Sequence, residues 1–206
     1  MVHYFVTCRN IVSGSFGTNP GPVRYLVVPD GAQEPDPSHE LQRTGRAQSR
    51  GAAWANKILE NFPIDPHTRR RQGHILFLVH GFNTKQGGAL DLHRDVRNGL
   101  AAAHWDGIVV SFDWPSEGAT FLYLDDRSDA RATANQLVQS AIALFVTFLE
   151  KDCDLNVHVL GHSIQISQCL GHLRMVWRGR CCDGLWGGHV WAAGSAVRPC
   201  TSSSTR

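Results

Sequence analysis

The sequence predicts an α/β fold in which helices flank one mostly parallel sheet. Between residues 75 and 160, short apolar runs of strand length alternate with longer stretches that have helical periodicity. This alternation is typical of strand–helix–strand units joined by right-handed crossovers. Two of the short runs, residues 75–79 and 107–112, are apolar at almost every position. Such runs indicate strands buried on both faces, as they are in parallel sheets.

Size and composition fit one globular domain without a nucleic-acid or membrane partner. The chain has 206 residues, which is long enough to bury a substantial core. Its formal net charge of +2 is too small to predict binding to nucleic acid or to a membrane surface. The basic run at residues 69–71 is short, as solvated loops often are.

The sequence shows no secretory signal and no membrane span, and this predicts the cellular location. Residues 1–8 have no basic start, apolar block or cleavage site of a secretory signal. No apolar run approaches the roughly 20 residues that a membrane span needs. We therefore expect a cytoplasmic protein whose six cysteines stay reduced.

The N-terminal third predicts two strands and a short helix. The strands are expected at residues 4–8 and 24–28, with a turn-rich connection over residues 14–22. Residues 29–50 are polar and have no hydrophobic period, which predicts a surface loop. A short helix is expected over residues 52–62.

Elements of the middle of the chain follow more regular patterns. Strands are predicted at residues 75–79, 107–112 and 155–160, and helices at residues 86–103 and 127–150. The first of these helices places four apolar side chains on one face: Leu92, Val96, Leu100 and Ala103.

Chemically distinctive residues follow each of these three strands. His80-Gly81 follows the first, Trp114-Pro115-Ser116 follows the second, and Ser163 follows the third. Sites in parallel α/β sheets form at the carboxyl ends of the strands. The sequence therefore predicts one site shared by the three segments.

Ser163 has the setting of a nucleophile. It lies in Gly161–Gln165, between a predicted strand and a possible helix start, as the serine of a nucleophile elbow does. A nucleophilic serine needs a base, a group that orients the base, and amide donors for the oxyanion. We expect these donors to be the amides of Ile164 and Phe82, with Gly81 permitting close approach of the backbone.

The neighbouring residues have less reactive interpretations. Ser163 alone would also suit a helix N-cap, but that role does not explain Gly161 and the His80-Gly81 loop. His80 is expected to shape this loop through hydrogen bonds rather than to transfer protons. We expect Trp114 to pack at the strand end and Pro115 to fix the turn.

These segments resemble the α/β-hydrolase superfamily, in the branch that carries His-Gly-Phe-Asn and Trp-Pro-Ser. The resemblance covers roughly residues 74–163 and rests on four segments in family order: residues 77–83, 111–116, 123–127 and 160–163. It implies hydrolysis of a small-molecule ester, or less readily of an amide or thioester, through an acyl-Ser163 intermediate. It implies no metal and no organic cofactor.

The resemblance ends after Ser163. Gln165 stands where the family has glycine, and residues 164–206 hold four of the six cysteines but only one acidic residue, Asp183. We therefore expect residues 1–163 to be the N-terminal part of a hydrolase domain that is truncated after the elbow. Residues 164–206 would be an atypical tail from a shifted reading frame, with one short helix around residues 170–177. A genuine divergent C-terminus is the alternative.

The acid and base of a triad are not identifiable from the sequence. Ser163, Asp183 and His189 occur in the order that α/β-hydrolases use, but the spacing leaves no room for the intervening elements. A zinc site in the tail would use Cys169, Cys181, Cys182, Cys200, His172 and His189, whose spacing fits no common ligand pattern. The rival to an active enzyme is a non-catalytic hydrolase fragment or binding module.

Overall fold

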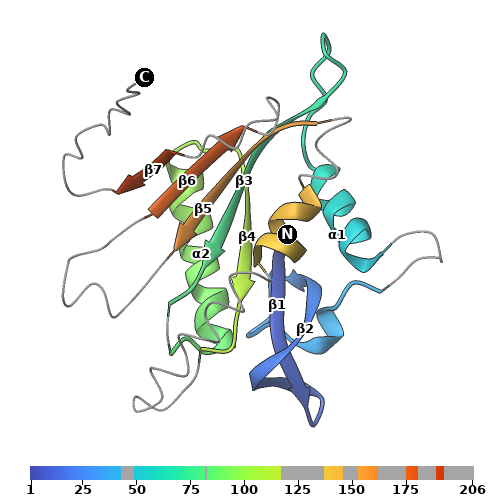
Figure 1. Cartoon of the computed structure of the whole chain (residues 1–206), viewed down its shortest axis with the longest axis vertical. Coiled ribbons are helices and arrows are strands. Elements are labelled where there is room, and N and C mark those ends of the chain that lie inside the picture. Colours follow the sequence, from blue (N-terminus) through green and yellow to red (C-terminus); the bar gives the residue numbers. More distant parts are fainter. Residues whose placement is uncertain are drawn as a thin grey trace, which may run out of the picture.

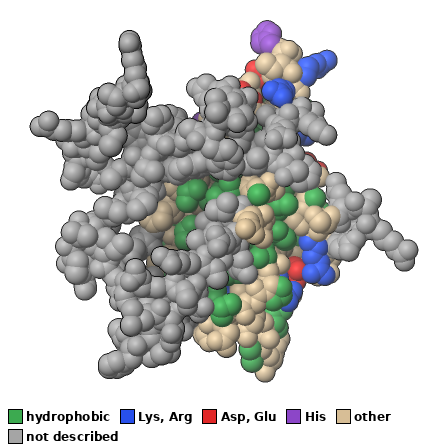
Figure 2. All heavy atoms as spheres, in the orientation of Figure 1, with side chains coloured by type: hydrophobic (Ala, Val, Ile, Leu, Met, Phe, Trp, Pro, Cys, Tyr) green, Lys and Arg blue, Asp and Glu red, His purple; other side chains and the backbone are tan. Residues whose placement is uncertain are grey.

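The computed structural model describes residues 1–42, 49–81, 83–116, 137–145, 153–161, 175–180 and 189–192. In this part of the chain, one seven-stranded sheet has the order β2-β1-β4-β3-β5-β6-β7, and helices lie beside it (Figure 1). None of the helices in the described residues is long and apolar enough to cross a membrane. On the face shown in Figure 2, the Lys and Arg side chains of the described residues lie in small separate groups.

The centre of the sheet is parallel and its two margins are antiparallel. β1, β4, β3 and β5 are parallel neighbours, whereas β2, β6 and β7 pair antiparallel at the margins. The strands are β1 (Val2–Val12), β2 (Ser15–Pro29), β3 (Arg71–Val79), β4 (Ile108–Asp113), β5 (Cys153–Gly161), β6 (Met175–Arg180) and β7 (His189–Ala192). The predicted strands at residues 75–79, 107–112 and 155–160 are thus present as adjacent parallel strands.

The helical segments in the described residues are η1 (Pro37–His39), α1 (Arg50–Leu59), α2 (Gln86–Ala102) and η3 (Leu137–Ile142), and η3 continues as α-helix to residue 145. Three of them lie where helices are predicted, whereas η1 is a short 3-10 turn within the predicted loop at residues 29–50. α1 starts at the N-cap Ser49, whose side chain accepts a hydrogen bond from the Ala52 amide. The described part of the predicted helix at 127–150 is therefore helical.

Apolar side chains pack on both faces of the sheet. On one face, α1 and the helix at residues 137–145 lie together (Figure 1), and the rings of Trp54 and Phe145 pack against each other at 6.0 Å. On the other face, α2 packs Leu92, Val96 and Leu100 against a buried cluster from β3 and β4. Alternate residues of β3 face the two layers, which is why its run is continuously apolar.

Two sequence-based expectations are wrong at the sheet margins. Residues 15–29 form a single strand, and the turn is confined to Ser13 and Gly14, which have φ angles of 50° and 85°. The prolines within this strand are tolerated because β2 is an edge strand. Residues 175–180 form strand β6 rather than the end of a short helix, because they pair with β5.

Candidate active site

The three predicted site segments start from the same edge of the sheet. Val79, the last residue of β3, pairs with Phe112 of β4 and with Gly161 of β5. Because these strands are parallel, the chain leaves all three at the same level. The loops that begin at His80 and Trp114 are therefore neighbours, and Gly161, the last described residue before Ser163, pairs with the end of β3.

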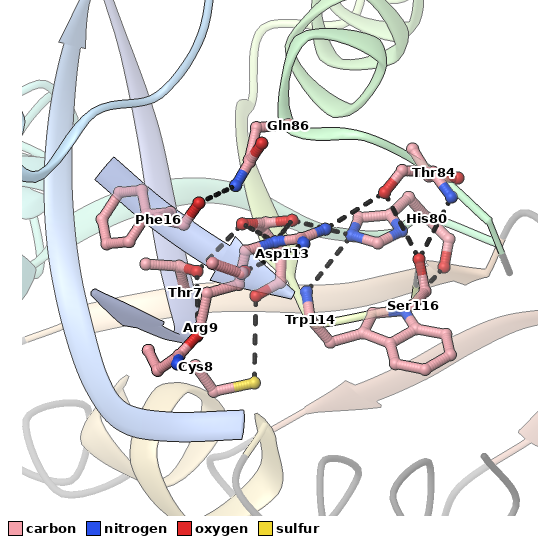
Figure 3. A network of polar contacts seen from close by, with 12 residues as sticks. Thr7, Cys8, Arg9, Phe16, His80, Thr84, Gln86, Asp113, Trp114 and Ser116 are labelled. Carbon is pink, nitrogen blue, oxygen red and sulfur yellow. Dashed lines mark hydrogen bonds and ion pairs between the residues drawn. The ribbon is translucent and has the colours of Figure 1, made fainter. Parts of the chain in front are cut away.

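Asp113 is the centre of a buried polar network at this edge (Figure 3). It is the last residue of β4 and has no exposed surface. Its carboxylate accepts hydrogen bonds from Thr7 Oγ1 and Arg9 Nε at 2.9 Å, and from His80 Nε2 at 3.0 Å. Three donors thus surround one carboxylate, as expected for a buried charge that is paired and hydrogen-bonded.

The charge state of Asp113 follows from these contacts. Burial by itself raises the pKa of the Asp113 carboxyl. The hydrogen bond from His80 and the positive charge of Arg9 act in the opposite direction and hold this pKa below its usual value. Asp113 is therefore a carboxylate at neutral pH.

His80 has partners at both ring nitrogens. Nδ1 lies 2.9 Å from the Gly81 carbonyl oxygen, and Nε2 lies 3.0 Å from Asp113. The Trp114 amide nitrogen is also 3.2 Å from Nε2. One ring nitrogen cannot donate to a carboxylate and accept from an amide at once, and the charged Asp113 favours donation. This geometry leaves His80 without a free nitrogen for proton transfer.

The Trp-Pro-Ser segment is bound to the loop that follows β3. The Trp114 indole stacks on the His80 ring at 5.8 Å and donates from Nε1 to the His80 carbonyl oxygen at 3.0 Å. Farther along, the Asn83 amide donates to the Ser116 carbonyl at 2.8 Å, and the Thr84 amide donates to Ser116 Oγ at 3.1 Å. Asn83 has a φ of 56°, a left-handed conformation that asparagine adopts more readily than most residues. The two loops therefore form one unit.

Several predicted site residues lie outside the described part of the chain. These are Ser163 and Ile164 of the elbow and Phe82 of the oxyanion loop. Gly161 is described as the last residue of β5, and His80 and Gly81 as buried residues after β3.

The alternative base of a triad, His189, has a described backbone position. It is the first residue of β7 and pairs with Arg178, which in turn pairs with His158 of β5. Its backbone is therefore level with His158 rather than with Gly161, from which Ser163 follows. Asp183, the alternative acid, lies outside the described residues.

A comparison with protein families matches residues 60–176 to a family described as an alpha/beta hydrolase of unknown function (DUF900). This match covers more than half of the 206 residues. The chain belongs to this α/β-hydrolase family. No curated protein and no solved structure matches the chain significantly. The resemblance predicted from the sequence and its fold class, a mostly parallel sheet with flanking helices, are thereby confirmed.

Family membership covers only part of the polar network. His80, Asp113 and Ser116 lie within the matched range, whereas Thr7 and Arg9 precede it. Sequence reasoning missed Thr7, Arg9 and Asp113. The signal available was a charged residue at the end of a buried strand, but Arg9 and Asp113 are 104 positions apart, and no local pattern pairs them.

Proposed function

We propose that this chain is a serine acyl hydrolase that cleaves a small-molecule ester in the cytoplasm, with Ser163 as the nucleophile. The observation that carries the proposal is the alignment of strand ends, with Gly161 paired to Val79. Gly161 precedes Ser163 by two residues, and Val79 directly precedes the His80–Gly81 loop, which supports the proposal. In α/β-hydrolases, the nucleophile and the loop that supplies an oxyanion donor meet at such an edge.

The reaction has two acyl-transfer steps. The Ser163 hydroxyl attacks the ester carbonyl, the acyl–oxygen bond of the substrate breaks, and the alcohol leaves with the serine's proton. Water then attacks the acyl-Ser163 ester and releases the carboxylic acid and the free serine. The amides of Phe82 and Ile164 donate to the oxyanion in both steps, and such donors are worth about 3 kcal/mol each.

His80 has a supporting role in this mechanism. Both of its ring nitrogens face other groups, so the general base is a different residue. Contacts from Asp113 and Trp114 hold His80, and Ser116 holds Asn83. These contacts anchor the loop on each side of Phe82, as preorganised oxyanion donors require.

Labelling with a fluorophosphonate probe tests the nucleophile. The wild-type chain should bind the probe covalently, and Ser163→Ala should abolish the label, because the probe reacts with an activated serine. Ser38→Ala is the matched control, since Ser38 is exposed on η1 and should leave labelling unchanged. Labelling that survives in Ser163→Ala would show that another residue is the nucleophile.

The second candidate is a non-catalytic hydrolase fragment that acts as a binding module. The composition of residues 164–206 favours it, together with the register of His189 away from the strand end. A wild-type chain that takes no label, unfolds at a low midpoint and binds hydrophobic dyes would support this candidate. Residues 164–206 come either from a shifted reading frame or from a genuine divergent C-terminus. Translating the gene in all three frames from the Ser163 codon distinguishes these two origins. A neighbouring frame with glycine in place of Gln165 and further strand–helix alternation would indicate a shifted frame.

A further inference from the structure

Arg9 connects the N-terminal hairpin, which consists of β1 and β2, to the candidate active site. Its side chain has no exposed surface, although arginine is rarely buried without partners. The guanidinium donates from Nε to Asp113 at 2.9 Å, from Nη2 to the Thr84 carbonyl at 3.1 Å and from Nη1 to the Gly17 carbonyl at 3.4 Å. One side chain from β1 thus binds the end of β4, the loop before α2 and the strand β2 (Figure 3).

The irregular pairing of β1 with β2 places Arg9 in this position. The register shifts on both sides of Arg9, between Thr7 and Arg9 and between Arg9 and Ile11. Such bulges change the direction in which a side chain points. A Cβ atom at Gly21 would lie 2.7 Å from the backbone nitrogen of Asn10, so glycine allows β2 to approach the bulged strand closely.

Arg9 reaches the loop after β3 by two routes. Directly, it binds the Thr84 carbonyl, which also accepts a hydrogen bond from Ser116 Oγ at 3.4 Å. Indirectly, it binds Asp113, which holds the His80 ring, and this ring contacts the Gly81 carbonyl. The same Gly81 carbonyl accepts a hydrogen bond from Thr84 Oγ1 at 2.9 Å. The loop is therefore held at both of its ends.

We propose that Arg9 is a positioning residue that fixes the loop from His80 to Thr84. The catalytic consequence rests on the function proposed above, because this loop carries the expected oxyanion donor Phe82. Arg9 and Asp113 neutralise each other, so Arg9 acts through the geometry of the loop and not through a net charge. The family match begins at residue 60, so Arg9 and the N-terminal hairpin lie outside the matched residues.

The substitution Arg9→Lys tests the proposal. Lysine keeps a positive charge near Asp113, but its single ammonium group cannot bind Asp113, Thr84 and Gly17 together. We expect faster hydrogen exchange of the Asn83 and Thr84 amides. We also expect kcat for p-nitrophenyl butyrate to fall by about 10-fold with little change in KM, because misplaced donors weaken only the transition state.

Arg24→Lys is the matched control. Arg24 lies on β2 opposite Thr7 of β1, and its side chain pairs with Glu40 at 2.8 Å rather than with Asp113. It should leave both kcat and the two amide exchange rates unchanged. Arg9→Met removes the charge as well and should shift both readouts further than Arg9→Lys. If Arg9→Met does not fold, Arg9→Lys still decides the question.

The readouts separate this proposal from the proposed function. Faster exchange at Asn83 and Thr84 in Arg9→Lys, but not in Arg24→Lys, supports positioning even if the wild-type chain hydrolyses no ester. In that case the hydrolase function fails and the positioning role stands. Unchanged exchange at both amides in a folded Arg9→Lys variant overturns the proposal, whatever the activity. So does an effect confined to KM in an active enzyme.

Discussion

At the residue scale, the stability of the fold depends on both members of the buried ion pair of Arg9 and Asp113. Removing one member of such a pair leaves the other buried without a counter-charge. Asp113→Asn should therefore lower the free energy of unfolding by about 3 kcal/mol, measured by urea denaturation. Glu40→Gln, which breaks the ion pairs with Arg24 and Arg50, serves as the comparison. This substitution should lower the free energy of unfolding by less than about 1 kcal/mol, because the side chains of these ion pairs are partly exposed.

The double variant Arg9→Met/Asp113→Leu distinguishes pairing from packing. Replacing both charged groups by apolar ones removes the unpaired charge and should recover much of the stability lost in Asp113→Asn. A double variant no more stable than Asp113→Asn would show that the hydrogen bonds of Thr7 and His80 contribute most of the stability.

His93 makes stability depend on pH. Burial, followed by the charges of His3, Arg97 and Arg94, lowers the pKa of His93 from 6.5 to about 3. The unfolded chain binds a proton as the pH falls below 6.5, but the folded chain does not until about pH 3. Stability should therefore decrease as the pH falls through this window, by up to about 5 kcal/mol from His93 alone.

His93→Gln tests this pH dependence. Glutamine removes the titrating group and retains a hydrogen-bonding partner for Ser111 Oγ, which lies 2.8 Å from His93 Nδ1. Urea denaturation at pH 6.5 and pH 4.5 should show a smaller loss of stability in the variant than in the wild type. Equal losses would assign the acid sensitivity to other groups.

At the scale of elements, two glycines near the end of α2 should respond oppositely to alanine. Gly99 is an exposed residue of α2 with open space around its Cα, so Gly99→Ala should stabilise the chain by about 0.5–1 kcal/mol. A Cβ at Gly107 would collide with the Trp105 ring and lie 2.6 Å from the His74 carbonyl oxygen. Gly107→Ala should destabilise the chain by about 1–3 kcal/mol. Thermal unfolding of the two variants measures both effects, and equal shifts would contradict the packing at Gly107.

The elements also show where local sequence patterns apply. β3, β4 and α2 lie where the apolar runs and the helical period predict them, because their patterns come from burial on a parallel sheet. β2 contains Pro20, Gly21 and Pro22, which predict a turn, yet pairing with β1 keeps the segment extended. In the same way, pairing with β5 makes a strand of residues 175–180. Long-range pairing overrides local propensity at both margins of the sheet.

At the scale of the molecule, the two faces of the sheet should unfold together. Phe145 is fully buried and packs its ring against Phe77 of β3 at 5.8 Å. Phe145→Ala should lower the free energy of unfolding by about 3–5 kcal/mol, because loss of the ring leaves a cavity in the core beside α1. If the chain is one cooperative unit, the free energy of opening measured by amide exchange in α2, on the opposite face, should fall by the same amount. Unchanged protection in α2 would mean that the two faces unfold separately.

The sequence by itself determined the fold class, the family and the edge of the sheet where the candidate site lies. These follow from periodicity and from short motifs, which are local and survive as patterns along the chain. Only the tertiary structure decided which residues stabilise that edge. Arg9 and Asp113 are 104 positions apart, and each looks like an ordinary charged residue in its own segment. Their pairing depends on the bulge in β1 and on the parallel contact between β1 and β4, which bring the two buried charges together.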